Sequence, residues 1–98
     1  MIMDHKLKLM VVDDSPLFRT WLIRSLSADD RFQIVGYAVN ALDAQEKIPL
    51  LQPDILTLDI EMPGMSGIDF LKQLLPIHPI PVILVSSLNL RVFDALEA

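Results

Sequence analysis

Acidic or hydroxyl side chains directly follow three of the short apolar runs in this sequence. They are Asp13 and Asp14 after the first run, Asp59 after the third, and Ser86 with Ser87 after the fourth. Crowded carboxylates repel one another and stay ionised most easily around a cation. Oxygen ligands suit Mg²⁺, which is usually bound by one or two carboxylates and by phosphate oxygens. A carboxylate beside that ion can attack an activated phosphorus, so the set predicts Mg²⁺-assisted transfer of a phosphoryl group onto an aspartate, with the Ser86 hydroxyl donating to a phosphoryl oxygen.

Each of these groups also has a simpler explanation when it is taken alone. Two acids before a helix favour its N-terminus, as Asp13 and Asp14 would. Asp59 could be an ordinary strand-end residue, and the serines could cap the next helix. Their joint occurrence after three separate runs favours a shared site. His5 and His78 have no second ligand nearby in the pattern, and we expect both at the surface.

Four apolar runs rich in Val, Ile and Leu predict strands, because they are too short for helices. They are Leu7–Val12, Phe32–Ala38, Ile55–Leu58 and Val82–Val85. We expect them to be covered on both faces, as in a parallel sheet between helices.

Apolar residues at helical spacing follow each run. The stripes are Phe18, Trp21, Leu22 and Leu26, then Ala41, Ala44, Ile48 and Leu51, then Ile68, Leu71, Leu74 and Leu75, with a last helical pattern at Leu90–Ala98. We expect the first stripe to face the core. Ser15 before Pro16 predicts an N-cap with proline in the first turn. Pro49 should end or kink the second helix near Ile48, since proline removes a helical hydrogen bond.

Strands that alternate with helices predict an α/β fold with a parallel sheet. Ligands of such sheets bind beyond the carboxyl ends of the strands. Three separate strand ends would therefore bring Asp13, Asp14, Asp59 and Ser86 to one pocket.

Composition limits the classes of protein to which this chain can belong. Its 98 residues, 52% apolar and 21% charged, predict one globular domain. A net charge of -5 without a run of Lys or Arg argues against direct binding of nucleic acid. The absence of cysteine excludes disulfides and thiolate metal sites. Since neither a signal peptide nor an apolar run of about 20 residues is visible, we expect a cytoplasmic protein with no membrane partner.

Three segments resemble the receiver domains of bacterial two-component response regulators. They are VVDDSPLFR at Val11–Arg19, PDILTLDIEMPGMSGIDFL at Pro53–Leu71 and PVILVSSL at Pro81–Leu88. More narrowly, DIEMPGMSG and the double serine resemble the regulatory domain of chemotaxis protein-glutamate methylesterase. The resemblance covers nearly the whole chain. It implies a flavodoxin-like doubly wound parallel sheet with strand order 2-1-3-4.

The resemblance also implies a role for each site residue. Asp59 would accept the phosphoryl group from a histidine kinase. Asp14 would bind Mg²⁺ directly, Asp13 largely through water, and Glu61 through its backbone carbonyl. Ser86 would be the switch hydroxyl that follows the phosphoryl group.

The family's fifth strand, with a lysine at its start, and its fifth helix would lie beyond Ala98. We therefore expect residues 1–98 to be one C-terminally incomplete receiver domain, controlling a methylesterase/deamidase effector domain in cis that is absent here. Whether the chain is an enzyme stays open, since it has no separate catalytic domain. An uncovered fourth strand, Val82–Val85, would favour a homo-oligomer formed through that edge or by exchange of a terminal element.

Two other functions share part of this pattern. Haloacid dehalogenase-type enzymes also use aspartate and Mg²⁺, but with an Asp-x-Asp motif after the first strand, and no Asp stands two places after Asp13 or Asp14. A fragment that only interacts or oligomerises, without phosphorylation, stays open because no lysine matches the family's position.

Overall fold

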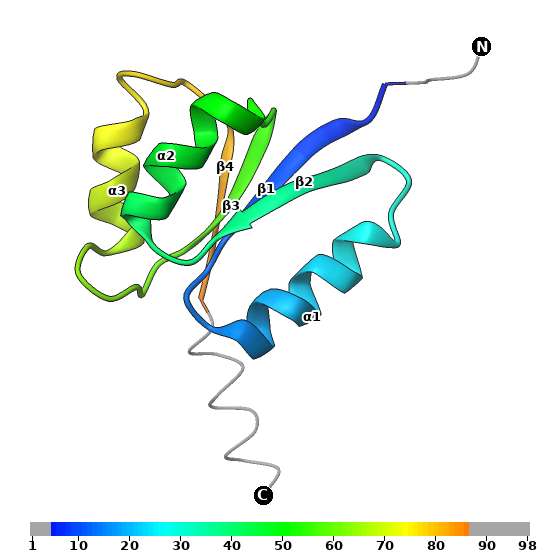
Figure 1. Cartoon of the computed structure of the whole chain (residues 1–98), viewed down its shortest axis with the longest axis horizontal. Coiled ribbons are helices and arrows are strands. Elements are labelled where there is room, and N and C mark those ends of the chain that lie inside the picture. Colours follow the sequence, from blue (N-terminus) through cyan, green and yellow to red (C-terminus); the bar gives the residue numbers. More distant parts are fainter. Residues whose placement is uncertain (1–4, 87–98) are drawn as a thin grey trace, which may run out of the picture.

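The chain forms an α/β fold around a four-stranded parallel sheet of order β2-β1-β3-β4, as predicted (Figure 1). The structure is a computed structural model, which describes residues 5–86. The elements in chain order are β1 (Leu7–Val12), α1 (Pro16–Ser27), β2 (Phe32–Ala38), α2 (Ala41–Leu51), β3 (Ile55–Asp59), α3 (Gly67–Leu74) and β4 (Val82–Val85). All four predicted strands are present, and β3 extends one residue further. The helix expected at Leu90–Ala98 lies outside the described residues.

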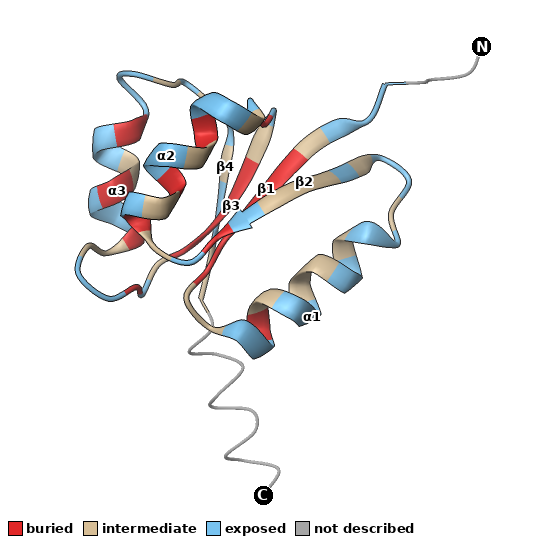
Figure 2. Ribbon diagram, viewed as in Figure 1, coloured by how far each residue is buried: buried red, intermediate tan, exposed pale blue. Residues whose placement is uncertain are grey.

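The sheet separates two helical layers. Helices α2 and α3 cover one face, and α1 covers the other (Figure 1). Successive side chains of a strand point to opposite faces. The core of the α2/α3 layer is made by alternate residues of β1 and β3 with the inner faces of those helices, namely Met10, Val12, Leu56, Leu58, Ala41, Ala44, Ile48, Phe70 and Leu74. Burial is therefore concentrated on the two central strands (Figure 2).

The prediction that all four strands are covered on both faces is wrong for β2 and β4. Ala38 alone is buried in β2, and in β4 Ile83 and Leu84 are exposed. These two strands form the edges of the sheet within residues 5–86, and the three described helices cover the centre better than the edges. The carboxyl ends of β1 and β3 therefore lie in the most buried part of the sheet.

Each described helix begins at a side chain that accepts a backbone N–H. Ser15 Oγ accepts from Phe18 N (3.4 Å), which confirms the predicted cap before Pro16. Asn40 and Ser66 do the same for α2 and α3. The helices have 12, 11 and 8 residues, and none of those described is long and apolar enough to cross a membrane.

Helix α2 contains Pro49 and continues to Leu51, so the predicted end near Ile48 is wrong. Pro49 is exposed and stands in the last turn, where only its own bond to the carbonyl four residues back is lost. Gln52 then ends the helix in the left-handed region, with φ of 48°, and its N–H donates to Ile48 O (2.8 Å).

Two predicted apolar stripes are buried only in part, because Phe18 of the first and Leu74 of the third are buried whereas other members are not. In α1 only Phe18 is buried, whereas Trp21 is 54% exposed and stacks on the Phe18 ring. In α3 the inner face is formed by Gly67, Phe70 and Leu74, and the predicted Ile68 and Leu75 are exposed. A shift of the α3 stripe by one or two positions rotates the face of the helix.

Candidate functional site

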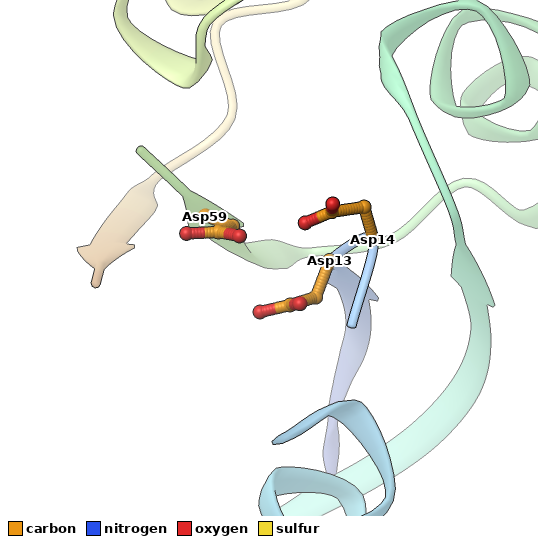
Figure 3. A group of neighbouring side chains, drawn as sticks. All are labelled: Asp13, Asp14 and Asp59. Carbon is orange, nitrogen blue, oxygen red and sulfur yellow. The ribbon is translucent and has the colours of Figure 1, made fainter. Parts of the chain in front are cut away.

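Three carboxylates meet at the carboxyl ends of the two central strands. Val12 of β1 pairs with Leu58 of β3, so the two strands end level with each other. Asp13 and Asp14 follow β1, and Asp59 is the last residue of β3. One carboxylate oxygen from each of the three acids lies within 4.8 Å of the others (Figure 3). The structure thus brings together the acids whose clustering the sequence predicts.

Asp13 is fully buried and held at several of its atoms. Its N–H donates to Ala38 O on β2 (3.0 Å), and its Oδ1 accepts from Ser15 N (2.8 Å). Its backbone carbonyl accepts from Arg19 Nη1 (2.9 Å). The neighbouring Asp14 has a buried Oδ1 with no hydrogen-bond partner among the described residues. That oxygen is available to a cation.

Asp59 is also fully buried, and the loop that follows it folds back onto the end of β3. Its Oδ1 accepts from Glu61 N (3.2 Å). Gly67, the first residue of α3, donates its N–H to Ile60 O (2.8 Å). A Cβ on Gly67 would collide with the backbone carbonyl oxygen of Asp59. A glycine at the start of α3 is therefore needed for the close approach of the helix to the acceptor strand.

Burial and like charge raise the pKa of Asp59 from 3.8 to about 6. Burial is the largest cause, the charge of Asp13 adds to it, and Asp14 adds further through its side chain. The N–H of Glu61 opposes these effects. Perturbed carboxyl groups of this kind are common at functional sites, and a bound cation would reverse the perturbation.

The chemistry of the donor set fits Mg²⁺. The cluster offers carboxylate oxygens and neither nitrogen nor sulfur, which is the preference of a hard divalent ion. Asp14 supplies a buried oxygen that has no hydrogen-bond partner among residues 5–86. The raised pKa of Asp59 means that its carboxylate is protonated more easily when no cation is near. Mg²⁺ at this position would satisfy both groups.

Two further predicted site residues are placed less directly. The Glu61 side chain is exposed, and the role of its backbone carbonyl as a ligand stays a prediction. Val85 of β4 pairs with Asp59, and Ile60 N donates to Val85 O (2.9 Å). Ser86 directly follows that pair and is half-buried, so it lies at the same edge of the sheet. Its role as a switch stays a prediction.

Sequence reasoning missed Arg19, which contacts the backbone of the site. A basic residue near the start of a helix opposes the helix dipole. Its position shortly after an acid pair was the available signal.

The matching family model defines the class of protein. The response regulator receiver domain matches residues 9–98, and the chain belongs to this family. The three clustered carboxylates form the acidic pocket of such a domain, typical of a receiver Mg²⁺ site.

Within that class, curated relatives are identical to this chain at nearly half of the aligned positions. Protein-glutamate methylesterase/protein-glutamine glutaminase 2 of Syntrophomonas wolfei is 48% identical over 94 residues, which cover 96% of this chain and 28% of the relative. The protein of the same name from Vibrio vulnificus is 46% identical over 94 residues, with 96% and 27% covered. The chain thus spans little more than a quarter of the length of these relatives.

Solved structures agree with this family. The response regulator domain of Thermotoga maritima CheB is similar with a TM-score of 0.79 at 40% identity, over 85% of this chain and 62% of that one. The signal receiver domain of the putative response regulator NarL from Mycobacterium tuberculosis has a TM-score of 0.77 at 36% identity, over 85% and 68%. The chain is therefore a receiver related to the regulatory domain of CheB.

Proposed function

We propose that residues 1–98 are a phosphoacceptor receiver domain of a two-component system, in which Asp59 takes a phosphoryl group from a histidine kinase. The observation that carries the proposal is the meeting of three carboxylate oxygens within 4.8 Å at the ends of β1 and β3. Asp14, Asp59 and the backbone carbonyl of Glu61 bind Mg²⁺, and Asp13 acts on it largely through water. The membership of the receiver family supports each assignment.

The proposed reaction is an in-line transfer between two covalent carriers. An oxygen of the ionised Asp59 attacks phosphorus and forms an O–P bond. The bond from phosphorus to an imidazole nitrogen of the kinase breaks, and its electron pair returns to that nitrogen. Mg²⁺ supplies neutralisation of charge on the phosphoryl oxygens. Asp13 and Asp14 keep the site negative enough to attract that cation, and the buried surroundings of Asp59 limit access of water to the acyl phosphate.

Ser86 supports the switch that would follow. A phosphoryl group adds negative charge and three strong acceptor oxygens. Ser86 follows Val85, which pairs with Asp59, so the residue lies at the same edge of the sheet and its hydroxyl is the donor that we propose. Its inward movement would alter the surface that follows β4.

The relatives support a proposal for the whole protein. Their printed names describe a glutamate methylesterase and glutamine glutaminase. We infer that phosphorylation of Asp59 controls such an effector domain in cis, within a cytoplasmic chemotaxis pathway. Partners would then be a histidine kinase and the effector domain.

Phosphorylation of the full-length protein by radiolabelled acetyl phosphate tests the acceptor. We expect Mg²⁺-dependent labelling of the wild type and none of Asp59→Asn. Asp14→Ala should lose most labelling, because the cation loses a direct ligand. Asp30→Asn removes an exposed acid in the turn after α1 and is the matched control, which should label normally. Persistent labelling of Asp59→Asn would contradict the assignment.

A further inference from the structure

Arg19 connects the acidic site to the edge of the sheet. Its Nη1 donates to the backbone carbonyl of Asp13 (2.9 Å), and its guanidinium carbon lies 4.6 Å from the centroid of the Tyr37 ring. Lys47 Nζ lies 5.0 Å from the same centroid and donates to Tyr37 O (2.8 Å). Arg19 belongs to α1 and Lys47 to α2, which cover opposite faces of the sheet (Figure 1). Tyr37 of β2 thus contacts a basic residue from each of the two helices, and one of these, Arg19, also binds the backbone of Asp13.

Lys47 is itself held in place. It pairs with Asp43 Oδ2 (3.1 Å) one turn earlier in α2, and the same oxygen accepts from Val39 N (3.0 Å). The end of β2 is therefore fixed to α2 by three contacts. Lys47 thus helps to fix the position of the Tyr37 ring that Arg19 contacts.

The bond from Arg19 fixes a peptide plane rather than a carboxylate. The carbonyl of Asp13 and the N–H of Asp14 belong to one rigid peptide unit. Asp13 is also held at two other atoms: its N–H donates to Ala38 O, and its Oδ1 accepts from Ser15 N. The Arg19 bond restrains the Asp13–Asp14 peptide plane directly, because it is made to the carbonyl oxygen of that plane. The direction of the Asp14 side chain, with its buried Oδ1, depends on this plane.

We propose that Arg19 is a positioning residue of the cation site, which orients the Asp13–Asp14 peptide so that Asp14 faces Asp59, and that Tyr37 holds Arg19 in the orientation this requires. The inference rests on the proposed Mg²⁺ site and deepens it. Substitution of groups that orient metal ligands through hydrogen bonds commonly weakens metal binding by about 10- to 100-fold.

Electrostatics and positioning predict opposite signs for the loss of Arg19. A guanidinium beside a cation site repels Mg²⁺, so removal of its charge alone would tighten binding. Removal of a positioning bond weakens binding, since Asp14 then samples orientations that do not face the ion. The sign of the change therefore separates the two.

The Mg²⁺ dissociation constant of the full-length protein, measured by calorimetry, is the test. We expect Arg19→Gln to bind Mg²⁺ about tenfold more weakly. Arg19→Lys keeps a charge and a donor and should recover part of the loss. Tyr37→Phe keeps the ring and should match the wild type, whereas Tyr37→Leu should weaken binding several-fold.

Arg31→Gln is the matched control for charge. Arg31 pairs with Asp29 (2.6 Å) and lies 5.7 Å from the Phe32 ring, at the opposite end of β2 from Tyr37. Like Arg19 it lies over an aromatic ring, but it donates to Asp29 and not to the site, so its loss should leave the Mg²⁺ dissociation constant unchanged. Thermal unfolding of each variant in excess chelator measures stability separately from affinity.

Equal or tighter Mg²⁺ binding by Arg19→Gln, in a wild type that binds Mg²⁺, would overturn this inference and leave the proposed function intact. A wild type that binds no Mg²⁺ would overturn both. If Arg19→Gln does not fold, the comparison of Tyr37→Leu with Tyr37→Phe decides, and equal dissociation constants for these two would overturn the inference. A purely structural role would lower the unfolding temperature of Arg19→Gln without changing its dissociation constant.

Discussion

Asp59 is fully buried, and the acidic side chains of Asp13 and Asp14 lie close to it. Without a cation this combination raises its pKa to about 6, mainly because burial disfavours the charged form. Its ordinary pKa of 3.8 applies in the unfolded chain. The folded protein therefore binds a proton at Asp59 more tightly than the unfolded protein does, and folding and titration are linked.

This linkage gives a pH dependence with a definite sign. Between pH 3.8 and about 6 the folded state holds more protons at Asp59 than the unfolded state, so its contribution to stability falls as pH rises. Below this window no stability is lost from the group, and above it the loss is complete. Asp59→Asn removes the group. We expect Asp59→Asn to become progressively more stable than the wild type across the window in chelator.

Urea unfolding of both proteins between pH 4 and 7 measures that difference. Acids that do not interact with Asp59 titrate in both proteins and cancel, including Asp29, whose pKa the hydrogen bond from Arg31 lowers to about 2. Saturating Mg²⁺ should remove the difference by neutralising the ionised form. A difference that stays constant with pH would contradict the raised pKa.

At the scale of elements, the close approach of α3 to β3 determines where the site can lie. Gly67 begins α3 against the backbone of Asp59, and Phe70 and Leu74 bury its inner face. Ser66 caps the helix by accepting from Asp69 N (3.2 Å). The loop from Ile60 to Ser66 is thereby held at both ends.

We expect Gly67→Ala to destabilise the protein by about 1–3 kcal/mol, the usual cost of overpacking a rigid contact. The added methyl group meets backbone atoms of Asp59 and Ile60, which cannot move without moving the acceptor carboxylate. Mg²⁺ affinity should therefore fall as well. Chemical denaturation and Mg²⁺ calorimetry measure the two effects.

Gly36→Ala is the control for this substitution. Its Cβ would lie 2.7 Å from Leu51 Cδ1, the end of a flexible side chain that can rotate away. It makes the same chemical change at a distance from the site and should cost less stability, with Mg²⁺ affinity unchanged. Equal losses in both variants would show that contact with Asp59 is not what matters.

The elements were predictable from the sequence where one property decides them. The four apolar runs became the four strands, and Ser15 and Pro16 began a helix, because strand length and cap chemistry are local. The inner face of α3 was not predictable, since Ile68 and Phe70 are both apolar and only packing on the sheet selects Phe70.

The candidate site also has one part that the sequence predicts and one part that depends on packing. Asp13, Asp14 and Asp59 could be found because they follow apolar runs, and parallel strands end at one edge. The position of Arg19 shortly after the acid pair was a weak signal, but its contact with the Asp13 carbonyl could not be predicted, because that contact depends on how α1 packs against the end of β2.

At the scale of the whole molecule, two kinds of electrostatics act on stability. The chain carries a formal net charge of -5, and any salt screens the resulting self-repulsion. Three of its acids are concentrated within one site, where screening by bulk salt is weak because Asp13 and Asp59 are buried. General screening and specific cation binding should therefore separate experimentally.

Mg²⁺ that binds only the folded protein stabilises it by about 2.7 kcal/mol at 100 times the dissociation constant. For a domain of this size that corresponds to a rise in the unfolding temperature of roughly 10 to 20 °C. NaCl at matched ionic strength should give a much smaller rise, because it only screens the net charge.

Asp14→Ala, which removes a proposed direct ligand, should reduce the effect of Mg²⁺ to that of NaCl. Asp30→Asn changes the net charge equally and should keep the larger rise in Mg²⁺. Calorimetric unfolding of the 98-residue chain in the two salts measures both. Equal rises in the two salts for the wild type would mean that net charge, and not the acidic cluster, governs the response to divalent cations.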